Sequence, residues 1–186
     1  MHTYPITIRH IFISPGHNYF GRPKDGPGDA PTHDVAQVEA RAGLGLVGDR
    51  YYAVAAHFEA QATFIAAEVF RAVVDEFNLT GASPALMRRN IVTEGINLNQ
   101  LLGHEFELEF EHGAVRFAGT KPCSPCGWMD AALAPGAWRF LKGRGGLRAR
   151  VLSDGIVRKG PAILRTAALL DNERITEPLP RPPLPG

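Results

Sequence analysis

Alternating apolar and polar positions recur along the chain, and each run predicts a β-strand with one buried face. The alternation is clearest in residues 106–110, where Phe and Leu alternate with Glu, and in the run that starts at Val115. His112 and Gly113 lie between these two runs and predict a hairpin turn. Other segments rich in β-branched residues predict further strands at residues 5–14, 33–42, 63–65, 88–95, 147–152 and 155–164.

One longer helix is predicted by apolar residues at helical spacing. In residues 66–77, alanine, valine and phenylalanine form one stripe, and Glu68, Arg71 and Asp75 lie on the opposite side. Shorter helical segments are predicted at residues 98–102, 125–133 and 135–141. Many short strands interspersed with short helices predict a mainly β fold with short helices, in the form of a barrel.

Two segments rich in glycine and proline interrupt this pattern. Residues 15–31 predict a long loop, and residues 14–20 either line a pocket or belong to a plain surface excursion. Residues 171–186 contain many prolines and almost no apolar periodicity, which predicts a mobile tail or a partner-binding arm. We therefore interpret residues 1–170 as one domain and residues 171–186 as a proline-rich tail.

Length and charge exclude several classes of protein. A chain of 186 residues with 45% apolar residues is long enough for one domain with a hydrophobic core. The 20 Lys and Arg residues nearly balance the 19 Asp and Glu residues, so no overall field attracts nucleic acid or an anionic membrane. No apolar run approaches the roughly 20 residues of a membrane-spanning helix, and no signal peptide is predicted. We therefore expect a cytoplasmic protein that binds neither nucleic acid nor membrane.

Both cysteines lie in the sequence Cys123-Ser124-Pro125-Cys126, just after a predicted strand. Ser124 suits the N-cap of a short helix and Pro125 suits its first position, which would place Cys126 in the first helical turn. The helix dipole and the nearby Lys121 would favour a thiolate there. Cys126 is therefore a candidate nucleophile or ligand for a soft metal.

Other interpretations of the two cysteines remain open. They are equally consistent with ordinary semi-buried thiols. A dithiol oxidoreductase is a weaker alternative, because the C-x-x-C redox motif usually follows the first strand of a βαβ unit, and no such unit is predicted. A zinc site is weaker still, since two thiolates need two more ligands at suitable spacing.

A glycine-rich segment matches a nucleotide-binding pattern without its context. Residues 43–48 fit G-x-G-x-x-G, but that fingerprint needs a preceding hydrophobic strand and a following helix. Neither neighbour fits. We interpret these glycines as turns that bring Asp49 and Arg50 to a rim.

Two further segments supply basic groups. In the predicted strand 88–95, neighbouring side chains face opposite ways, so only one of Arg88 and Arg89 is expected to point into a given pocket. The basic turn 143–146 contains three glycines and offers consecutive backbone N–H groups. Such a turn can cradle an anion.

Four segments, taken in order, resemble the MOSC family, the domain named for the C-terminal part of molybdenum cofactor sulfurase. They are residues 43–51, 89–95, 121–126 and 143–152. The resemblance extends over most of the chain between Ile6 and Leu164, and the chain looks like the small stand-alone prokaryotic members. It implies a closed, mostly antiparallel β-barrel with helices packed on it.

In that family a cysteine is proposed to carry sulfur as a persulfide or to ligate molybdenum. The resemblance implies a molybdenum-cofactor- or sulfur-handling protein, with sulfur transfer or cofactor-dependent oxidoreduction as its enzymatic options. Cys126 is the preferred persulfide carrier or metal ligand, and Cys123 could resolve a persulfide or disulfide formed there. Reductase-type members take molybdenum on a further cysteine nearer the end of their domain. This chain has none after Cys126, so their N-hydroxyl reduction is not carried over.

The resemblance also implies the pterin-based molybdenum cofactor, which bears a phosphate and a dithiolene. Its pocket needs fork-shaped donors, backbone N–H groups and a soft sulfur. The expected partner is this cofactor, or a sulfur donor or acceptor protein, and no pyridoxal phosphate is expected. A binding module that holds the cofactor without turnover is the main alternative. The residues expected to bind the cofactor are Lys121, Arg89, Asn90, Arg144, Gly145, Gly146, Asp49 and Arg50.

Overall fold

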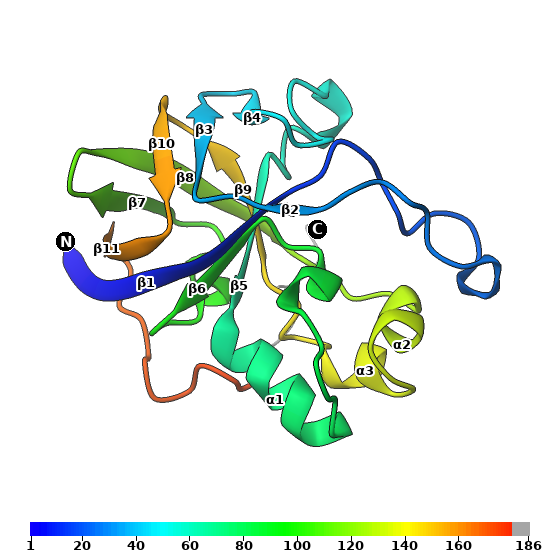
Figure 1. Ribbon diagram of the computed structural model, residues 1–186. Helices are drawn as coiled ribbons and strands as arrows, with labels where there is room; N and C mark the ends of the chain where they lie inside the picture. Colours follow the sequence, from blue (N-terminus) through cyan, green and yellow to red (C-terminus); the bar gives the residue numbers. More distant parts are fainter. Residues whose placement is uncertain (180–186) are drawn as a thin grey trace, which may run out of the picture.

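The fold is a closed β-barrel of seven strands, seen in a computed structural model that describes residues 1–179 (Figure 1). The strands follow the order β11–β7–β8–β9–β5–β6–β1, and β1 pairs again with β11 to close the barrel. Only β5 and β6 run parallel, so the barrel is mixed but mostly antiparallel, as predicted. The barrel strands are β1 (His2–Ile13), β5 (Ala62–Ala66), β6 (Ile91–Glu94), β7 (Glu105–Phe110), β8 (Gly113–Pro122), β9 (Leu147–Val151) and β11 (Gly160–Thr166).

A smaller sheet lies beside the barrel and contains β10 (Gly155–Arg158), β3 (Gln37–Arg41) and β4 (Gly45–Leu46). The short strand β2 (His33–Asp34) pairs with the end of β1. The predicted strand 33–42 is thus broken into β2 and β3. The predicted strand 155–164 is likewise divided into β10 and β11, which belong to different sheets.

The barrel interior is filled mainly by aliphatic side chains around three aromatic rings. Phe64 packs edge-on against Phe117 with ring centroids 5.2 Å apart, and Phe106 stacks on Phe117 at 5.4 Å. All three side chains are buried. These residues come from β5, β7 and β8, so the apolar positions of the predicted alternation meet inside the barrel.

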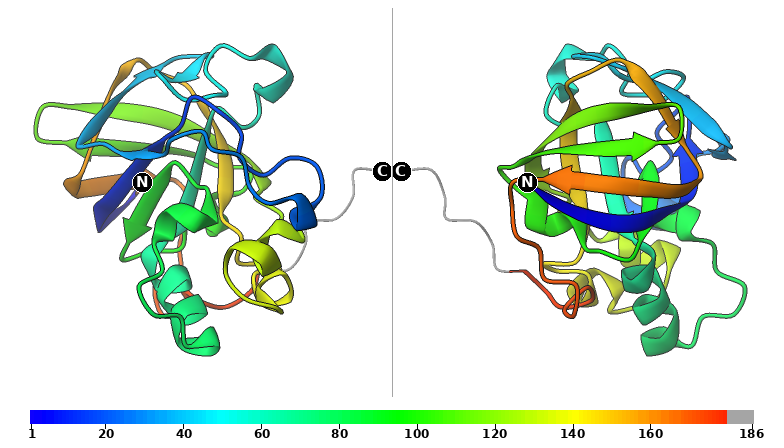
Figure 2. Two further views of the ribbon diagram at one scale, coloured as in Figure 1. Left: turned by 45° about the vertical axis from the view of Figure 1, so that its right-hand side comes forward. Right: turned by 90° about the vertical axis from the view of Figure 1, so that its left-hand side faces the viewer.

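Three short helices cover one end of the barrel (Figures 1 and 2). Helix α1 (Ala67–Phe77) follows β5 directly and buries Val69, Phe70 and Val73, which confirms the predicted apolar stripe. Helices α2 (Trp128–Ala132) and α3 (Ala137–Phe140) pack in the same second core. Within residues 1–179, no helix combines the length and the apolar character needed to cross a lipid bilayer.

Four 3₁₀ turns complete the elements of the described chain. The turn η1 (Pro23–Asp25) is the only regular element within the long loop between β1 and β2. The other three turns are η2 (Ala55–His57), η3 (Pro84–Met87) and η4 (Leu98–Leu101). The loop and η3 both approach the end of the barrel where the cysteines lie, so they can contribute side chains to a site there.

The first part of the proline-rich tail is bound to the domain. The side chain of Gln100 donates to the carbonyl of Asp171 and accepts from its N–H. Arg144 Nε donates to the carbonyl of Thr176 at 2.7 Å, and Leu179 N donates to the carbonyl of Gly143 at 3.0 Å. Residues 180–186, the remainder of the predicted tail, lie outside the described residues.

The segment that carries the cysteines crosses the glycine turn 143–146 at very short range. Cys123 N donates to the carbonyl of Gly146 at 2.7 Å, and a Cβ added at Gly145 would overlap the carbonyl oxygen of Cys123. A Cβ at Gly146 would overlap the carbonyl oxygen of Phe64. Glycine is therefore required here because the backbones touch, and this contact fixes where the thiol segment lies.

This crossing predicts that Gly145→Ala destabilises the fold. We expect the free energy of unfolding in urea to fall by roughly 1–3 kcal/mol because the new methyl group overpacks the contact. Gly127→Ala is the matched control, since an added Cβ meets nothing within 4 Å and its φ of −57° is ordinary. The control should change stability by less than about 0.5 kcal/mol. Equal effects of the two variants would contradict the close crossing.

Candidate functional site

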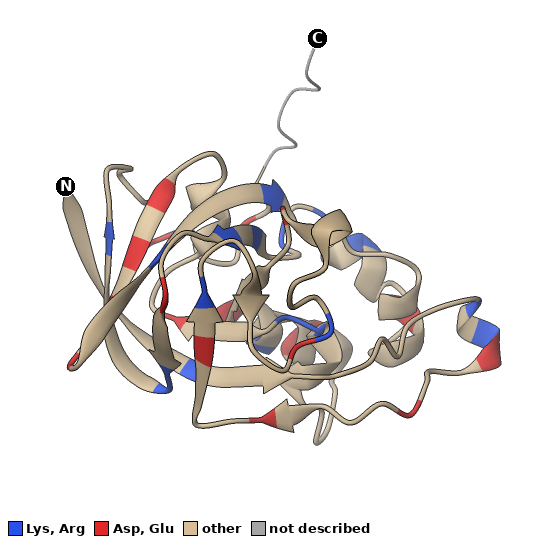
Figure 3. Ribbon diagram, turned by 90° about the horizontal axis from the view of Figure 1, so that it is seen from above, with Lys and Arg blue, Asp and Glu red and all other residues tan. Residues whose placement is uncertain are grey.

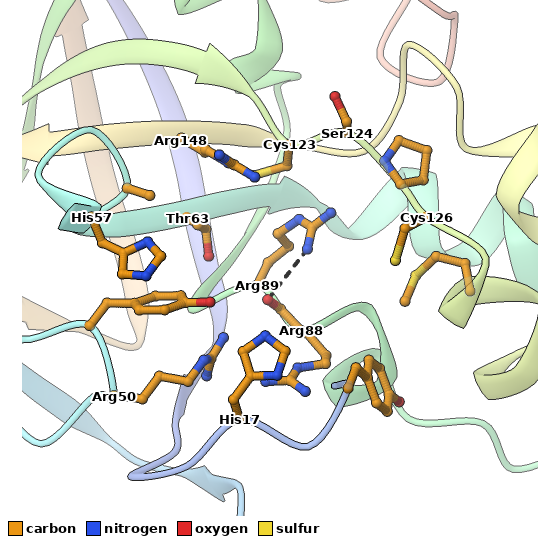
Figure 4. A pocket seen from close by; sticks show the side chains of 15 residues that line it. His17, Arg50, His57, Thr63, Arg88, Arg89, Cys123, Ser124, Cys126 and Arg148 are labelled. Carbon is orange, nitrogen blue, oxygen red and sulfur yellow. Dashed lines mark hydrogen bonds between the residues drawn. The ribbon is translucent and has the colours of Figure 1, made fainter. Parts of the chain in front are cut away.

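A cavity of about 230 Å³ opens where the barrel end meets the loop 14–31 and the cysteine segment (Figure 4). Its side chains come from five parts of the chain that are far apart in sequence. The lining residues are His17, Tyr19, Arg50, Tyr51, His57, Ala60, Thr63, Arg88, Arg89, Cys123, Ser124, Pro125, Cys126, Met129 and Arg148. The set combines four arginines, two histidines and both thiols, and it includes no Asp or Glu.

The positive charge of this cavity is local. Basic and acidic residues are interspersed over the rest of the ribbon (Figure 3), in keeping with the formal net charge of +1. A cluster of guanidinium groups without lining carboxylates attracts small anions even in a nearly neutral protein. The cavity therefore suits an anionic ligand.

Arg88 and Arg89 both line the cavity, although the sequence predicted that only one of them would. The predicted strand 88–95 begins only at Ile91 in the structure. Arg88 is instead the C-cap of η3 and adopts a left-handed backbone with φ of 57°. The strand rule of opposite-facing neighbours does not apply to such a turn, so two adjacent arginines share one pocket.

Arg89 also fixes two segments of the site relative to each other. Its Nε donates to the carbonyl of Gly145 at 2.6 Å, and its Nη1 donates to the carbonyl of Met87 at 2.9 Å. These bonds tie the turn η3 to the glycine turn that the cysteine segment crosses. Arg89 therefore positions Arg88 and the thiol segment, besides adding charge.

A buried polar network lies behind the arginines. Asn90 Nδ2 donates to Asp49 Oδ2 at 2.9 Å, and Asn90 Oδ1 accepts from the hydroxyl of Thr63 at 2.8 Å. Asp49 Oδ1 accepts from the N–H of Tyr51, and Asp49 Oδ2 lies 3.6 Å from Arg50 Nη1. The carboxylate thus balances part of the Arg50 charge from below the cavity.

Two buried guanidinium nitrogens have no hydrogen-bond partner in the described part of the chain, namely Arg50 Nε and Arg88 Nη1. A buried N–H without a partner costs about 1–3 kcal/mol, and more when the group is charged. The planes of these arginines are held in place by aromatic rings. Arg50 lies over the Tyr51 ring at 4.6 Å, and Arg88 lies over Tyr19 at 4.6 Å. Guanidinium groups held in place with an N–H that lacks an acceptor favour a negatively charged ligand nearby.

The ionisable groups of the cavity respond to this crowding. Burial, followed by the Arg50 guanidinium, lowers the pKa of Arg88. Burial, and then the charges of Arg88, Arg50 and His57, lower the pKa of His17. Neighbouring positive charges therefore make Arg88 and His17 harder to charge, and a bound anion would relieve that repulsion.

The two cysteines differ in exposure. Cys123 is buried at 4% exposure, and Cys126 is exposed, with its sulfur on the cavity side of the segment before α2 (Figure 4). The prediction of Ser124 as N-cap and Cys126 in the first helical turn is wrong. Helix α2 starts at Trp128 with Gly127 as N-cap. The carbonyl of Cys126 accepts from the N–H of Met129 and closes a turn. Cys126 therefore lies before the helix and not in its first turn.

A second cavity, of about 500 Å³, lies on the other side of the cysteine segment. Cys123, Ser124 and Pro125 line both cavities, so this segment is the wall between them. The second cavity contains the exposed ring of Trp138, with Lys142 Nζ over it at 4.4 Å. Its lining is mostly apolar, which distinguishes it from the arginine cavity.

Six of the eight predicted cofactor-binding residues divide among three places. Arg89 and Arg50 line the arginine cavity, and Asn90 and Asp49 lie buried behind it. Gly145 and Gly146 line the second cavity instead.

Lys121 and Arg144 line neither of the two cavities. Lys121 is exposed and pairs with Glu59 at 2.5 Å. Arg144 stacks over Phe140 and donates to the carbonyls of Phe140 and Thr176. Both basic side chains therefore have partners within the chain and are not placed for a ligand in the arginine cavity.

The sequence analysis did not identify several lining residues, chiefly Arg148, Tyr51 and His57. Arg148 lies within the segment 143–152 that carried the family resemblance, so that segment contained the signal. His17 and Tyr19 belong to the loop that was expected either to line a pocket or to be a surface excursion, and the structure shows the first. In residues 1–179, no three His, Cys, Asp or Glu side chains are grouped so that they could hold a metal ion.

Comparison with known proteins agrees with this fold and motif order. The profile of the MOSC domain matches residues 32–164. The chain belongs to the MOSC domain family. This family is associated with proteins like molybdenum cofactor sulfurase. A search of curated protein sequences found no match.

Solved structures of small MOSC-domain proteins share the fold. The chain resembles YuaD from Bacillus subtilis with a TM-score of 0.64 and 16% identity, covering 88% of this chain and 96% of that one. It resembles YiiM from Geobacillus stearothermophilus with a TM-score of 0.60 and 14% identity, over 86% and 75% of the two chains. It resembles YiiM from Escherichia coli with a TM-score of 0.56 and 17% identity, covering 96% of this chain and 76% of that one. At such identities the likeness establishes the fold alone.

The crowding of positive groups predicts pH-dependent binding of sulfate, which keeps its double charge across neutral pH. Burial and the neighbouring positive charges hold the pKa of His17 below its ordinary value of about 6.5. A bound dianion stabilises protonated His17, so the protein takes up protons on binding and the affinity rises as the pH falls below about 6.5. Isothermal titration calorimetry at several pH values would measure this. His17→Gln should weaken the pH dependence. An affinity that stays constant or falls on acidification would contradict the assignment.

Proposed function

We propose that this MOSC protein handles the molybdenum cofactor or sulfur, with an anion held by the arginine cavity and Cys126 as persulfide carrier or metal ligand. The observation that supports this proposal is a juxtaposition. An exposed thiol shares one small cavity with Arg50, Arg88 and Arg148, and no lining carboxylate opposes them. Such a cavity can hold an oxyanion against a nucleophilic or metal-binding sulfur.

The residues present fit the anionic end of the pterin cofactor. The unpartnered nitrogens Arg50 Nε and Arg88 Nη1 suit phosphate oxygens, and Arg148 adds a third guanidinium from β9. The thiol of Cys126 is the soft ligand type that molybdenum accepts. When bound, the metal would supply redox chemistry. The chain itself would hold the anion, orient it through Arg88 and Arg89, and present the sulfur.

Cys123 has a different place in this proposal. It is buried in the wall between the two cavities, and its N–H and carbonyl contact the glycine turn. Cys126 is therefore the thiol that a donor can reach first. A dithiol oxidoreductase gains no support, because the C-x-x-C segment follows a strand that pairs antiparallel with β7 and β9 and is not part of a βαβ unit.

The proposal predicts what the protein carries when it is purified from a host that makes the cofactor. Wild-type protein should contain either pterin with molybdenum, or an additional sulfur on Cys126, as found by metal analysis and persulfide-sensitive mass spectrometry. Cys126→Ser should lose the additional sulfur or the metal. Unchanged pterin content and unchanged activity in Cys126→Ser would leave only a binding module. An additional sulfur found on Cys123 alone would contradict the assignment to Cys126.

Arginine variants test the anion-binding half of the proposal. Arg148→Gln should weaken binding of phosphate or of the pterin by about 10–100-fold, the loss expected for one hydrogen bond to a charged group. Arg150→Gln is the matched control, because Arg150 lies on the same strand and has the same charge but is exposed outside the cavity. Calorimetry would measure both. Equal losses in the two variants would indicate unspecific attraction and contradict a built site.

A further inference from the structure

We propose that the arginine cavity accepts a small dianionic sulfur donor of the thiosulfate class and that Cys126 takes the terminal sulfur from it. This inference rests on the proposed function, because both make Cys126 a sulfur carrier, and it names the donor. Three observations support it: the size of the cavity, the balance of its charges and the place of the reachable thiol.

Cavity size limits what can lie wholly beside Cys126. A volume of about 230 Å³ is below the roughly 300–1,000 Å³ of sites for drug-sized ligands. It is ample for a tetrahedral oxyanion with one extra sulfur atom. A large donor could insert only part of itself, whereas thiosulfate fits entirely among the arginines.

Charge selects a dianion over a neutral or monoanionic donor. The carboxylate of Asp49 balances only part of the Arg50 charge, since its oxygens also accept hydrogen bonds from Asn90 and from the N–H of Tyr51. No described acceptor faces Arg50 Nε or Arg88 Nη1. Arg148 adds a further positive charge from β9. Binding two negative charges here offsets the mutual repulsion of these cations.

The guanidinium charges suit the transfer of sulfur from thiosulfate to Cys126. The thiolate of Cys126 attacks the terminal sulfur of thiosulfate, a new S–S bond forms, and the S–S bond of the donor breaks. The electron pair of that bond leaves with sulfite, and Cys126 becomes a persulfide. No external oxidant or reductant is consumed. Negative charge grows on the departing sulfite oxygens, and fixed guanidinium groups stabilise such developing charge.

The persulfide can then be discharged by a second nucleophile. Cyanide attacks the outer sulfur, thiocyanate leaves, and the Cys126 thiolate is restored. Cys126 is exposed on the open side of the cavity, so an acceptor can reach it, whereas Cys123 is buried in the wall. Cyanide serves here as the laboratory acceptor that makes turnover measurable.

The test uses the full-length protein, reduced and then freed of reductant, with thiosulfate as donor. Sulfite should appear, one additional sulfur should be found on Cys126 by peptide mass spectrometry, and added cyanide should give repeated formation of thiocyanate. Cys126→Ser should abolish all three. Arg148→Gln should lower kcat/KM for thiosulfate by about 10–100-fold, and the exposed Arg150→Gln should leave it unchanged.

An alkyl persulfide, which carries at most one negative charge, is tried in parallel and separates this inference from the proposed function. If it loads Cys126 and thiosulfate does not, the donor is wrong and the sulfur-carrier function stands. If neither donor loads Cys126, the sulfur-carrier function fails as well. Equal rates for thiosulfate in wild type and Arg148→Gln would also overturn the inference, because the arginines would then take no part in donor selection.

Discussion

The hydrogen bonds of buried Asn90 hold together the floor on which the arginine cavity is built. Its side chain donates to the Phe12 carbonyl and to Asp49, and its amide oxygen accepts from the backbone N–H and hydroxyl of Thr63. Phe12 and Thr63 belong to β1 and β5, and Asn90 directly precedes β6. One amide thus joins three neighbouring strands and fixes the carboxylate that lies beneath Arg50. Every donor and acceptor of this amide is satisfied, so the floor is rigid.

A rigid floor allows the protein to keep like charges close together. Burial and then the Arg50 charge lower the pKa of Arg88, and two N–H groups of these arginines have no acceptor in the described chain. Such an arrangement costs stability, and it persists only where the surrounding structure prevents the side chains from turning away. The rings of Tyr51 and Tyr19 prevent this, and Tyr19 is itself stacked on Trp128 at 5.2 Å. These rings hold the two arginines close together despite their repulsion, and this arrangement suits an anion beside Cys126.

Local patterns predicted the barrel well. The strand alternation, the apolar stripe of α1 and the loop 15–31 each depend on residues that are close together in the sequence. The site was harder to predict, since its charges meet only after the barrel closes. Arg148 and Arg50 come from distant segments, and Arg88 reaches the cavity through a left-handed turn that reads as a strand in the sequence. Lys121 was expected at the site because it is adjacent to the cysteines. Its pairing with Glu59 depends on tertiary contacts that no local pattern contains.

We expect an oxyanion to bind among Arg50, Arg88 and Arg148, next to Cys126. Crystals grown with selenate would show whether it does, because anomalous scattering from selenium locates the anion without assumptions about activity. An anomalous peak should appear inside the cavity, with oxygen atoms within hydrogen-bond distance of the Arg50 and Arg88 guanidinium groups. An empty cavity at saturating selenate, or peaks only at exposed basic residues elsewhere, would contradict it.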